Sequence, residues 1–333
     1  MTAHTMTSVG LRPRYGVVVL TMGQRPEDLE RAVCSVLRQR DVDVDVVVVG
    51  NGWQPVGLPE GVRTLSLQDN VGIPAGRNAG AALVRGDLLF FLDDDAELPR
   101  DDVLATIAGH FARDERLGLL QPRIADPGGA PPPRRWTPRV RVGDPERSSY
   151  ATVVWEGAIA LRADVFRKAG GWADEFFYAH EGIDLAWRVW DTGSTAWYAG
   201  DIVVHHPAND PARNALFYRM NARNRVYVAR RNLPALLVPV YLAAWTAITV
   251  MRLRPGPELR TWFGGLFEGA VTPCGPRRPL SWRTVLRMSL AGRPNRPGRR
   301  PPVAPACRTP TARASARASA TPSSRSATGC PPA

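Results

Sequence analysis

The sequence predicts an α/β fold with a mostly parallel central sheet and helices on both of its faces. Short apolar runs rich in β-branched residues, which are typical of strands buried on both faces, recur along the chain. Between them lie segments whose apolar residues repeat at helical spacing, and this alternation is typical of parallel strands joined by crossover helices. The chain has 333 residues, of which 44% are hydrophobic, and this is enough for one large domain or two smaller ones.

The expected elements can be placed in order along the chain. Residues 16–22 (GVVVLTM) are expected to form a buried strand, and residues 25–40 a helix with one apolar face. A second strand at 42–49 stops at the turn sequence Gly50-Asn51-Gly52. The remaining elements are expected at 76–84 (helix), 87–92 (strand), 101–113 (helix), 152–161 (strand), from 163 (helix), 184–191 (helix) and 213–231 (helix). Residues 122–149, rich in Pro, Gly and Arg, are expected to form a long loop over a site or a disordered insertion.

One strand ends in three consecutive carboxylates. Residues 88–97 read LLFFLDDDAE, so that Asp93, Asp94 and Asp95 follow the apolar run directly. Adjacent carboxylates repel one another unless water or a cation neutralises them, and open α/β sheets bind ligands at the carboxyl ends of their strands. Mg²⁺ or Mn²⁺ would turn this repulsion into coordination, and such ions commonly bridge phosphates. The triplet therefore indicates a metal and nucleotide-diphosphate site, with a solvated acidic turn as the alternative.

Four sequence blocks, taken in order and spacing, resemble the inverting glycosyltransferases of family 2. The blocks are TMGQRPEDLERAVCSVLRQ, NVGIPAGRNAG, LLFFLDDDAELP and GGWADEFFYAHEGIDLAWRVWDTG. Within that family the chain is similar to rhamnosyltransferases and galactofuranosyltransferases. The resemblance implies a GT-A fold for residues 12–232 and a nucleotide-diphosphate sugar as the donor.

The resemblance also implies a set of donor-site residues. Those expected to bind the nucleotide sugar are Thr21, Arg25, Asn51, Asn70, Gly72, Arg77, Asn78, Asp93 and Asp94. Asp95 is expected to bind Mn²⁺ or Mg²⁺, and one of His205 and His206 to complete the metal shell or contact the diphosphate. Family members often carry a base-reading Asp where this chain has Gly50, so the identity of the base stays open. UDP is the expected nucleotide, with dTDP and GDP as alternatives.

The acceptor side of the site is expected to supply a base, because inverting transfer requires deprotonation of the attacking hydroxyl. Family members commonly have Glu-Asp-x-Asp where this chain has Glu181-Gly182-Ile183-Asp184, so the residue often taken as the base is absent. Glu181 is the expected base, and Asp184 is expected either to orient the acceptor or to pair with Arg188. The expected acceptor-binding residues are Trp155, Glu156 and Trp172, with core packing as the alternative for both tryptophans.

Two further regions follow the expected catalytic domain. Residues 233–290 are expected to form a helical segment, whose uncharged stretch 233–251 is bracketed by arginines. That stretch has three alternative interpretations: a transmembrane helix, an interfacial helix on a membrane surface, or a buried core helix. Residues 291–333 contain eight Arg and no Asp or Glu and are expected to be a disordered basic tail.

Net charge and one missing motif argue against nucleic-acid binding and against sugar-phosphate nucleotidyl transfer. The formal charge is +12, and without the eight arginines of the tail the body carries only about +4, which gives nucleic-acid binding little support. A sugar-phosphate nucleotidyltransferase is disfavoured because GVVVLTMGQRPED lacks the Gly-rich loop of that class.

The expected function is metal-dependent, inverting sugar transfer to a glycan or polyprenyl-linked acceptor in cell-envelope polysaccharide synthesis. A catalytically impaired binding or scaffold protein is the alternative, because Gly182 stands at the usual position of the base. The expected location is the cytoplasm, either free or at the inner face of the plasma membrane.

Overall fold

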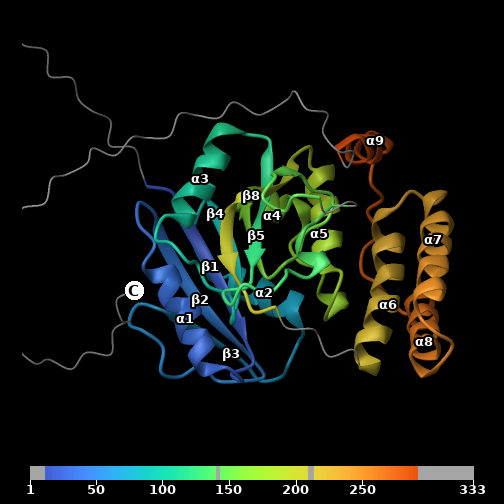
Figure 1. The fold of residues 1–333 in the computed structure, drawn as a ribbon, viewed down its shortest axis with the longest axis horizontal. Coiled ribbons are helices and arrows are strands. Elements are labelled where there is room, and N and C mark those ends of the chain that lie inside the picture. Colours follow the sequence, from blue (N-terminus) through green and yellow to red (C-terminus); the bar gives the residue numbers. More distant parts are fainter. Residues whose placement is uncertain (1–11, 140–142, 209–213, 292–333) are drawn as a thin grey trace, which may run out of the picture.

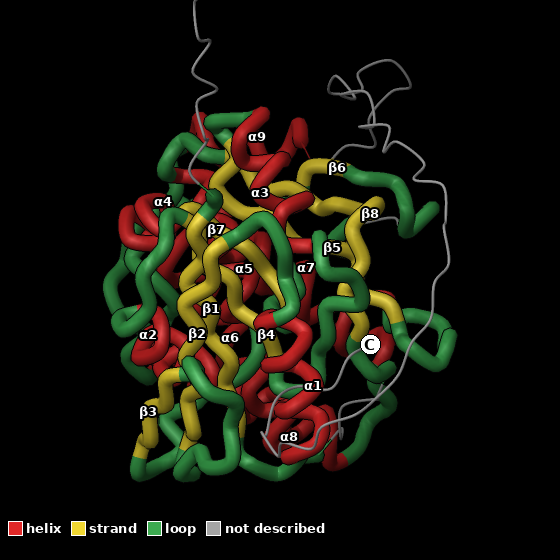
Figure 2. The backbone as a smooth tube through the Cα atoms, turned by 90° about the vertical axis from the view of Figure 1, so that its left-hand side faces the viewer, coloured by secondary structure: helices red, strands yellow, loops and turns green. Residues whose placement is uncertain are grey.

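An eight-stranded sheet with helices on both faces forms the centre of the molecule (Figure 1 and Figure 2). The computed structural model describes residues 12–139, 143–208 and 214–291. The strand order is β3-β2-β1-β4-β7-β5-β8-β6. The strands are β1 (Arg14–Thr21), β2 (Asp43–Asn51), β3 (Arg63–Leu67), β4 (Leu88–Asp93), β5 (Leu117–Ala125), β6 (Ser149–Tyr150), β7 (Ala158–Arg162) and β8 (Thr195–His205). The expected α/β class is therefore confirmed.

The first half of the sheet is parallel. β1 pairs with β2 and with β4, and β2 pairs with β3, in each case in the parallel sense. β1, β2 and β4 consist mainly of Val, Leu and Phe because they are covered on both faces. Since these strands run in one direction, their carboxyl ends lie along the same edge of the sheet.

The second half of the sheet is mixed, which the sequence pattern did not indicate. β7 runs antiparallel to β4 and β5, and β6 runs antiparallel to β8, whereas β5 and β8 are parallel. Because of the reversal at β7, the residues just before this strand lie beside the end of β4. The Asp93 N–H accordingly donates to the Gly157 carbonyl at 2.8 Å.

Each face of the sheet has its own hydrophobic core. α1 (Pro26–Leu37) and α3 (Val103–Arg113) cover one face, and α2 (Ile73–Ala81), α4 (Ala163–Ala169) and α5 (Glu181–Asp191) cover the other. Successive residues of a strand point to opposite faces, so Val17 and Val19 belong to the first core and Val18 to the second. Two short 3-10 helices, Arg134–Trp136 and Asp174–Phe176, lie in the connections.

Several boundaries differ from the expectation. β3 is an edge strand with exposed polar residues, so it lacks the apolar run that marks the other strands. The expected loop 122–149 begins inside β5, and Trp136 within it is buried at 1% exposure. Residues 152–157 form no strand, and α5 begins at Glu181 rather than at 184.

In the described part of the chain, four helices follow β8. They are α6 (Ala215–Asn232), α7 (Leu237–Arg252), α8 (Pro257–Val271) and α9 (Trp282–Ala291). α6 contributes Tyr227 and Val228 to the α5-side core and lies beside α7 and α8 (Figure 1). α7 forms most of the uncharged stretch 233–251 and has no buried residue. No helix in the described part of the chain has the length and apolarity needed to span a membrane. The expected tail lies outside the described residues from position 292 onward.

Candidate active site

The end of β1 and the loop after it contact the acidic triplet. The Thr21 hydroxyl donates to Asp94 Oδ2 at 2.6 Å, and Arg25 donates to Asp94 Oδ1 at 2.6 Å and also to Asp95. Burial raises the pKa of Asp94 to about 6, because desolvation outweighs the hydrogen bond from Thr21 and the charge of Arg25. Both oxygens of Asp94 are engaged within the protein, so this carboxylate fixes the shape of the loop.

Asp93, Asp95 and His206 form a cluster suited to a cation. One ligand atom from each residue lies within 4.8 Å of those of the other two. His206 Nε2 lies 3.1 Å from Asp95 Oδ1, and its Nδ1 lies 2.8 Å from the Pro207 carbonyl oxygen. Burial lowers the pKa of His206, but its hydrogen bond to Asp95 and the charge of Asp95 outweigh burial and hold that pKa above its ordinary value. Of the two adjacent histidines, His206 rather than His205 joins this cluster, because neighbouring residues point in opposite directions.

Two tryptophans pack against the imidazole of His206. The ring centroids of Trp155 and Trp136 lie 4.9 Å and 5.5 Å from that of His206, both in edge-on geometry. Gln121 links the two tryptophans, since its amide donates to the Trp136 carbonyl and its Oε1 accepts from the Trp155 N–H, each at 2.8 Å. Sequence reasoning missed Trp136 and Gln121. For Trp136, a large aromatic residue within the Pro- and Arg-rich stretch 122–149 could have indicated a buried position.

Asn51 and Asn70 brace the loop after β3. Asn51 Nδ2 donates to Asn70 Oδ1 at 2.8 Å, and Asn51 Oδ1 accepts from the Val71 N–H at 2.9 Å. Asn70 Oδ1 also accepts from the Gly72 N–H at 2.9 Å. Gly72 has a φ of +86°, and a Cβ there would lie 2.6 Å from the Phe177 carbonyl oxygen, so this position requires glycine. These contacts fix the shape of the loop between β3 and α2, which carries the expected nucleotide-sugar-binding residues Asn70 and Gly72.

Trp53 closes the space beside Gly50, the position at which the family resemblance implies a base-reading Asp. A Cβ on Gly50 would lie 2.0 Å from the carbonyl oxygen of Trp53. The Trp53 ring covers the loop after β1, because a Cβ on Gly23 would lie 2.4 Å from it. Trp53, which the sequence pattern did not single out, therefore borders the loop between β1 and α1, called the nucleotide loop below, which carries the expected nucleotide-binding residue Arg25.

Arg77 connects α2 to the acidic triplet. It is 2% exposed, donates to Asp93 Oδ1 at 2.7 Å, and its guanidinium lies 5.0 Å from the ring centroid of Trp172. Its Nη1 is buried and has no hydrogen-bond partner among the described residues. Asn78 bonds both the N–H and the carbonyl of Trp172, and Trp172 packs on Phe91. For Trp172 the core-packing alternative is therefore the one the structure supports.

The turn before α5 has an unusual backbone. Phe177, Ala179 and His180 have φ values of 60°, 71° and 68°, which are costly for residues that carry a Cβ. The buried side chain of Asn224 in α6 holds the turn in place. Its Nδ2 donates to three carbonyl oxygens, those of Phe176 at 2.9 Å, Tyr178 at 2.6 Å and Ala179 at 2.8 Å.

Glu181 directly follows this turn and is 1% exposed. Its Oε2 is buried, and no described residue forms a hydrogen bond with it. Glu156 lies beside the next residue, since a Cβ on Gly182 would lie 2.6 Å from Glu156 Oε2. The structure thus brings the expected base and one expected acceptor residue to the same place.

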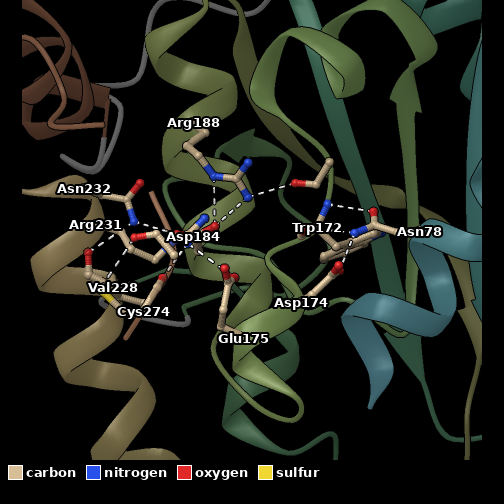
Figure 3. Close-up of polar contacts among 12 residues, drawn as sticks. Asn78, Trp172, Asp174, Glu175, Asp184, Arg188, Val228, Arg231, Asn232 and Cys274 are labelled. Atoms are coloured by element: carbon tan, nitrogen blue, oxygen red, sulfur yellow. Dashed lines mark hydrogen bonds and ion pairs between the residues drawn. The ribbon is translucent and has the colours of Figure 1, made fainter. Parts of the chain in front are cut away.

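Asp184 lies in a different environment, a buried polar network (Figure 3). It accepts from Arg188 Nε at 2.8 Å, from Arg231 Nε at 3.0 Å and from Asn232 Nδ2 at 2.6 Å. Both of its oxygens are thereby occupied. Of the two expected roles, this geometry favours pairing with Arg188 over contact with an acceptor.

Comparison with known proteins agrees with this geometry. Residues 17–169 match the family model described as glycosyl transferase family 2. The chain carries a glycosyl transferase family 2 domain. The pre-mycofactocin glycosyltransferase of Mycobacterium tuberculosis is 27% identical over 268 residues, which cover 74% of this chain and 55% of that protein. The chain thus spans about half the length of the curated relatives it matches.

Solved structures share the fold of the family 2 domain. Staphylococcus aureus TarS 1–349 has a TM-score of 0.52 at 14% identity, over 78% of this chain and 81% of that one. GalNAc-T7, solved with UDP, GalNAc and Mn²⁺, has a TM-score of 0.55 at 14% identity, over 78% and 56%. Mannosyltransferase PcManGT of Pyrobaculum calidifontis, solved with GDP-Man and Mn²⁺, has a TM-score of 0.50 at 16% identity, over 84% and 80%. These likenesses establish the GT-A fold.

The candidate site extends beyond the part of the chain that matches the family model. The match ends at residue 169, whereas Glu181, His206 and Asn224 follow it. The matched residues therefore supply Asp93 and Asp95 of the acidic cluster but not His206. The turn before α5, the end of β8 and α6 complete the candidate site.

Proposed function

We propose that this chain transfers a sugar, with inversion, from a nucleotide-diphosphate sugar to a hydroxyl group of a glycan or polyprenyl-linked acceptor. The proposed setting is cell-envelope polysaccharide synthesis. The observation that carries the proposal is the cluster of Asp93, Asp95 and His206, whose ligand atoms lie within 4.8 Å of one another beside the expected nucleotide loop. The family 2 domain and the glycosyltransferase relative support it.

The cluster fits a hard divalent cation such as Mn²⁺ or Mg²⁺. Two carboxylates and one imidazole are ligands that Mn²⁺ accepts, and the acidic pair would otherwise be a concentration of negative charge. Asp93, Asp95 and His206 would hold the ion, which would supply positive charge to the diphosphate leaving group. Arg77, with one buried unpaired nitrogen, would bind a phosphate oxygen.

UDP is the proposed donor nucleotide, with dTDP and GDP as alternatives. Structures of similar fold contain UDP, UDP-GlcNAc or GDP-Man, so this fold accommodates more than one base. Gly50 offers no side chain to read a base edge, whereas the Trp53 ring offers a face on which any base can stack. We therefore expect only modest selection between bases.

Calorimetric titration tests the donor site. The wild-type chain is titrated with UDP, dTDP and GDP, each with Mn²⁺ and with EDTA. Asp95→Ala should weaken Mn²⁺-dependent binding of the preferred nucleotide at least about tenfold, or about 1.4 kcal/mol, because a metal ligand is lost. The matched control Asp164→Ala removes an exposed carboxylate on α4 and should bind as wild type. Binding that persists in EDTA and in Asp95→Ala would contradict the metal site.

A catalytically impaired binding protein is the second candidate, because Gly182 stands where relatives carry a carboxylate. Both candidates would bind UDP with Mn²⁺, but only an enzyme would turn over a donor. Release of UDP from UDP-glucose, UDP-galactose or UDP-GlcNAc in the presence of Mn²⁺ separates them.

We further propose that α7, α8 and α9 lie on a lipid surface, where a polyprenyl-linked acceptor would be found. These helices and the residue preceding α7 expose large apolar side chains: Leu236, Val240, Val250, Met251, Phe263, Phe267, Val271, Trp282, Leu286 and Leu290. Exposed arginines lie among them, at positions 252, 254, 260 and 283. Apolar side chains with basic residues beside them suit the headgroup region of an anionic bilayer.

Co-sedimentation with vesicles tests the lipid surface. The wild-type chain should sediment with phosphatidylglycerol-containing vesicles and less with pure phosphatidylcholine. The double variant Phe263→Ser, Phe267→Ser should remain in solution, whereas Val56→Ser, which changes an exposed apolar residue of the family 2 domain, should behave as wild type. Equal sedimentation of all three proteins would refute the proposal.

A further inference from the structure

The geometry points to Glu156 and Glu181 as a carboxyl pair that serves as the base, with Glu156 as the member that contacts the acceptor hydroxyl. This inference rests on the proposed function. It assigns the proton transfer to two residues from separate parts of the chain, one just before β7 and one at the start of α5.

The first observation is the space beside Gly182. A Cβ on this residue would lie 2.6 Å from Glu156 Oε2 and 2.6 Å from the Val154 carbonyl oxygen. Real Cβ atoms essentially never approach other atoms this closely, so residue 182 can only be glycine while Glu156 keeps its position. The carboxylate of Glu156 therefore fills the space that a side chain at position 182 would enter.

The second observation is that Glu156 and Glu181 lie within electrostatic range of each other. Glu156 Oε2 lies beside residue 182, which directly follows Glu181, and the charge of Glu181 raises the pKa of Glu156. Two carboxyl groups this close repel each other when both are ionised, which favours a state in which the pair shares one proton. Such a pair can accept one further proton.

The third observation is the difference in exposure. Glu181 is 1% exposed, whereas Glu156 is only partly buried. Glu156 is therefore the more accessible member of the pair. This difference assigns the contact to Glu156 and gives Glu181 the role of its proton partner.

The surroundings suit a base that works near neutral pH. Burial raises the pKa of Glu156 well above its ordinary value, and the neighbouring charge of Glu181 raises it further, while Arg77 acts in the opposite direction. Burial also raises the pKa of Glu181. A carboxyl pair with raised pKa values is a stronger proton acceptor than an exposed carboxylate.

The pair also lies next to the candidate metal cluster. Gly157, the residue after Glu156, accepts a hydrogen bond from the Asp93 N–H at 2.8 Å. Trp155, the residue before it, packs on His206 with ring centroids 4.9 Å apart. An acceptor hydroxyl on Glu156 would therefore lie close to a donor sugar whose diphosphate is held at the cluster.

In the proposed step, the acceptor oxygen forms a bond to the anomeric carbon as the bond from that carbon to the diphosphate oxygen breaks. The electron pair of the broken bond leaves with the nucleoside diphosphate. The hydroxyl proton moves to Glu156, whose own shared proton moves to Glu181, so the pair ends with two protons.

Donor hydrolysis measures this step without knowledge of the acceptor, because water takes the place of the hydroxyl. The measured quantity is UDP release from UDP-glucose, UDP-galactose or UDP-GlcNAc with Mn²⁺. Glu156→Gln should lower the rate at least about 100-fold while UDP affinity in Mn²⁺ stays within about twofold, since a base acts only in the transition state. Glu115→Gln, at an exposed position, is the matched control and should match wild type.

Chemical rescue separates a catalytic role from a structural one. Sodium formate should restore part of the turnover of Glu156→Ala, because a small carboxylate can occupy the space left beside Gly182. Formate should not restore the turnover of Asp95→Ala. The inference is overturned if Glu156→Gln keeps turnover within about threefold of wild type, or if Glu156→Ala is inactive and does not respond to formate. Mn²⁺-dependent turnover by the wild-type chain tests the proposed function separately, since it does not depend on which residue is the base.

Discussion

At Gly50 and Gly182, where the resemblance to family 2 leads us to expect a carboxylate, a neighbouring group occupies the space that a side chain would need. The Trp53 carbonyl oxygen would lie 2.0 Å from a Cβ at position 50, and Glu156 Oε2 would lie 2.6 Å from one at position 182. Glycine is therefore required at both positions as long as these neighbours keep their places. The sequence identifies the glycine, but only the structure identifies the group that lies beside it.

His180 gives a pH prediction at the residue scale. Burial lowers its pKa well below the ordinary value, with a further contribution from the charge of Arg225, so the folded chain keeps this histidine neutral. The unfolded chain binds a proton near pH 6.5. Stability should therefore fall as the pH drops below about 6.5, by at most about 1.4 kcal/mol per pH unit.

Urea unfolding measures the free energy of unfolding of the wild-type chain and of His180→Asn, each at pH 7.5 and at pH 5.5. Asparagine tolerates the left-handed backbone at this position, where φ is 68°, and does not titrate. The wild-type chain should lose more stability on acidification than the variant. An equal loss would show that His180 does not contribute to the pH dependence.

At the scale of elements, α6 determines the shape of the turn that presents Glu181. Asn224 forms hydrogen bonds to three carbonyl oxygens of that turn. On the nucleotide-sugar side, the backbone N–H of Ile73, at the start of α2, forms a hydrogen bond of 2.8 Å to the Phe177 carbonyl oxygen. The turn thus contacts both the acceptor side and the donor side of the site. A helix outside the match to the family model therefore shapes the proposed site.

Asn224→Ala tests this role of α6. The carbonyl oxygens of Tyr178 and Ala179 would lose their donor, whereas that of Phe176 keeps a bond from Arg223 at 2.8 Å. The free energy of unfolding should therefore fall by about 2–4 kcal/mol, and turnover of the sugar donor should fall with it. Asn214→Ala is the matched control, because Asn214 caps the same helix by accepting from the Phe217 N–H at 3.0 Å. The control should lose about 1 kcal/mol and keep its turnover. Similar turnover in the two variants would contradict the prediction. Urea unfolding and UDP release supply the two measurements.

At the scale of the whole molecule, the C-terminal helices are part of the fold that holds the site. Arg231 joins Asp184 of α5 to the Cys274 carbonyl, 2.5 Å away, and Arg230 donates to the Gly269 carbonyl of α8 at 2.6 Å. The expected domain boundary at residue 232 lies within this set of contacts. Figure 3 shows how α5, α6 and the segment at Cys274 converge on Asp184.

Arg231→Met tests this connection. The change leaves one oxygen of a buried carboxylate without its cationic partner, and we expect a loss of about 3 kcal/mol in the free energy of unfolding. Arg167→Met, at an exposed position on α4, should change stability by less than about 0.5 kcal/mol. Urea unfolding of the full chain measures both. If Arg231→Met lowers the free energy of unfolding no more than the control does, α5 and the C-terminal helices are not coupled through this residue.

Much of the fold could be predicted because strands buried on both faces and amphipathic helices leave local patterns. β1, β4 and α1 have such patterns and were predicted. β3 was missed because an edge strand needs no apolar run, and the reversal at β7 was missed because strand direction leaves no local signal. In the candidate site the acidic triplet could be predicted, whereas Trp136 and Asn224 could not, because their partners lie far along the chain.

The sequence by itself determined the α/β class, the acidic strand end and the order of the motif blocks, since each depends on residues that are close together along the chain. The tertiary structure alone decided that His206 rather than His205 joins Asp93 and Asp95, that Asp184 is bound by two arginines, and that Glu156 fills the space beside Gly182. The physical reason is that each of these contacts joins side chains from separate elements. Their distances are set by the packing of helices on the sheet, which no local pattern encodes.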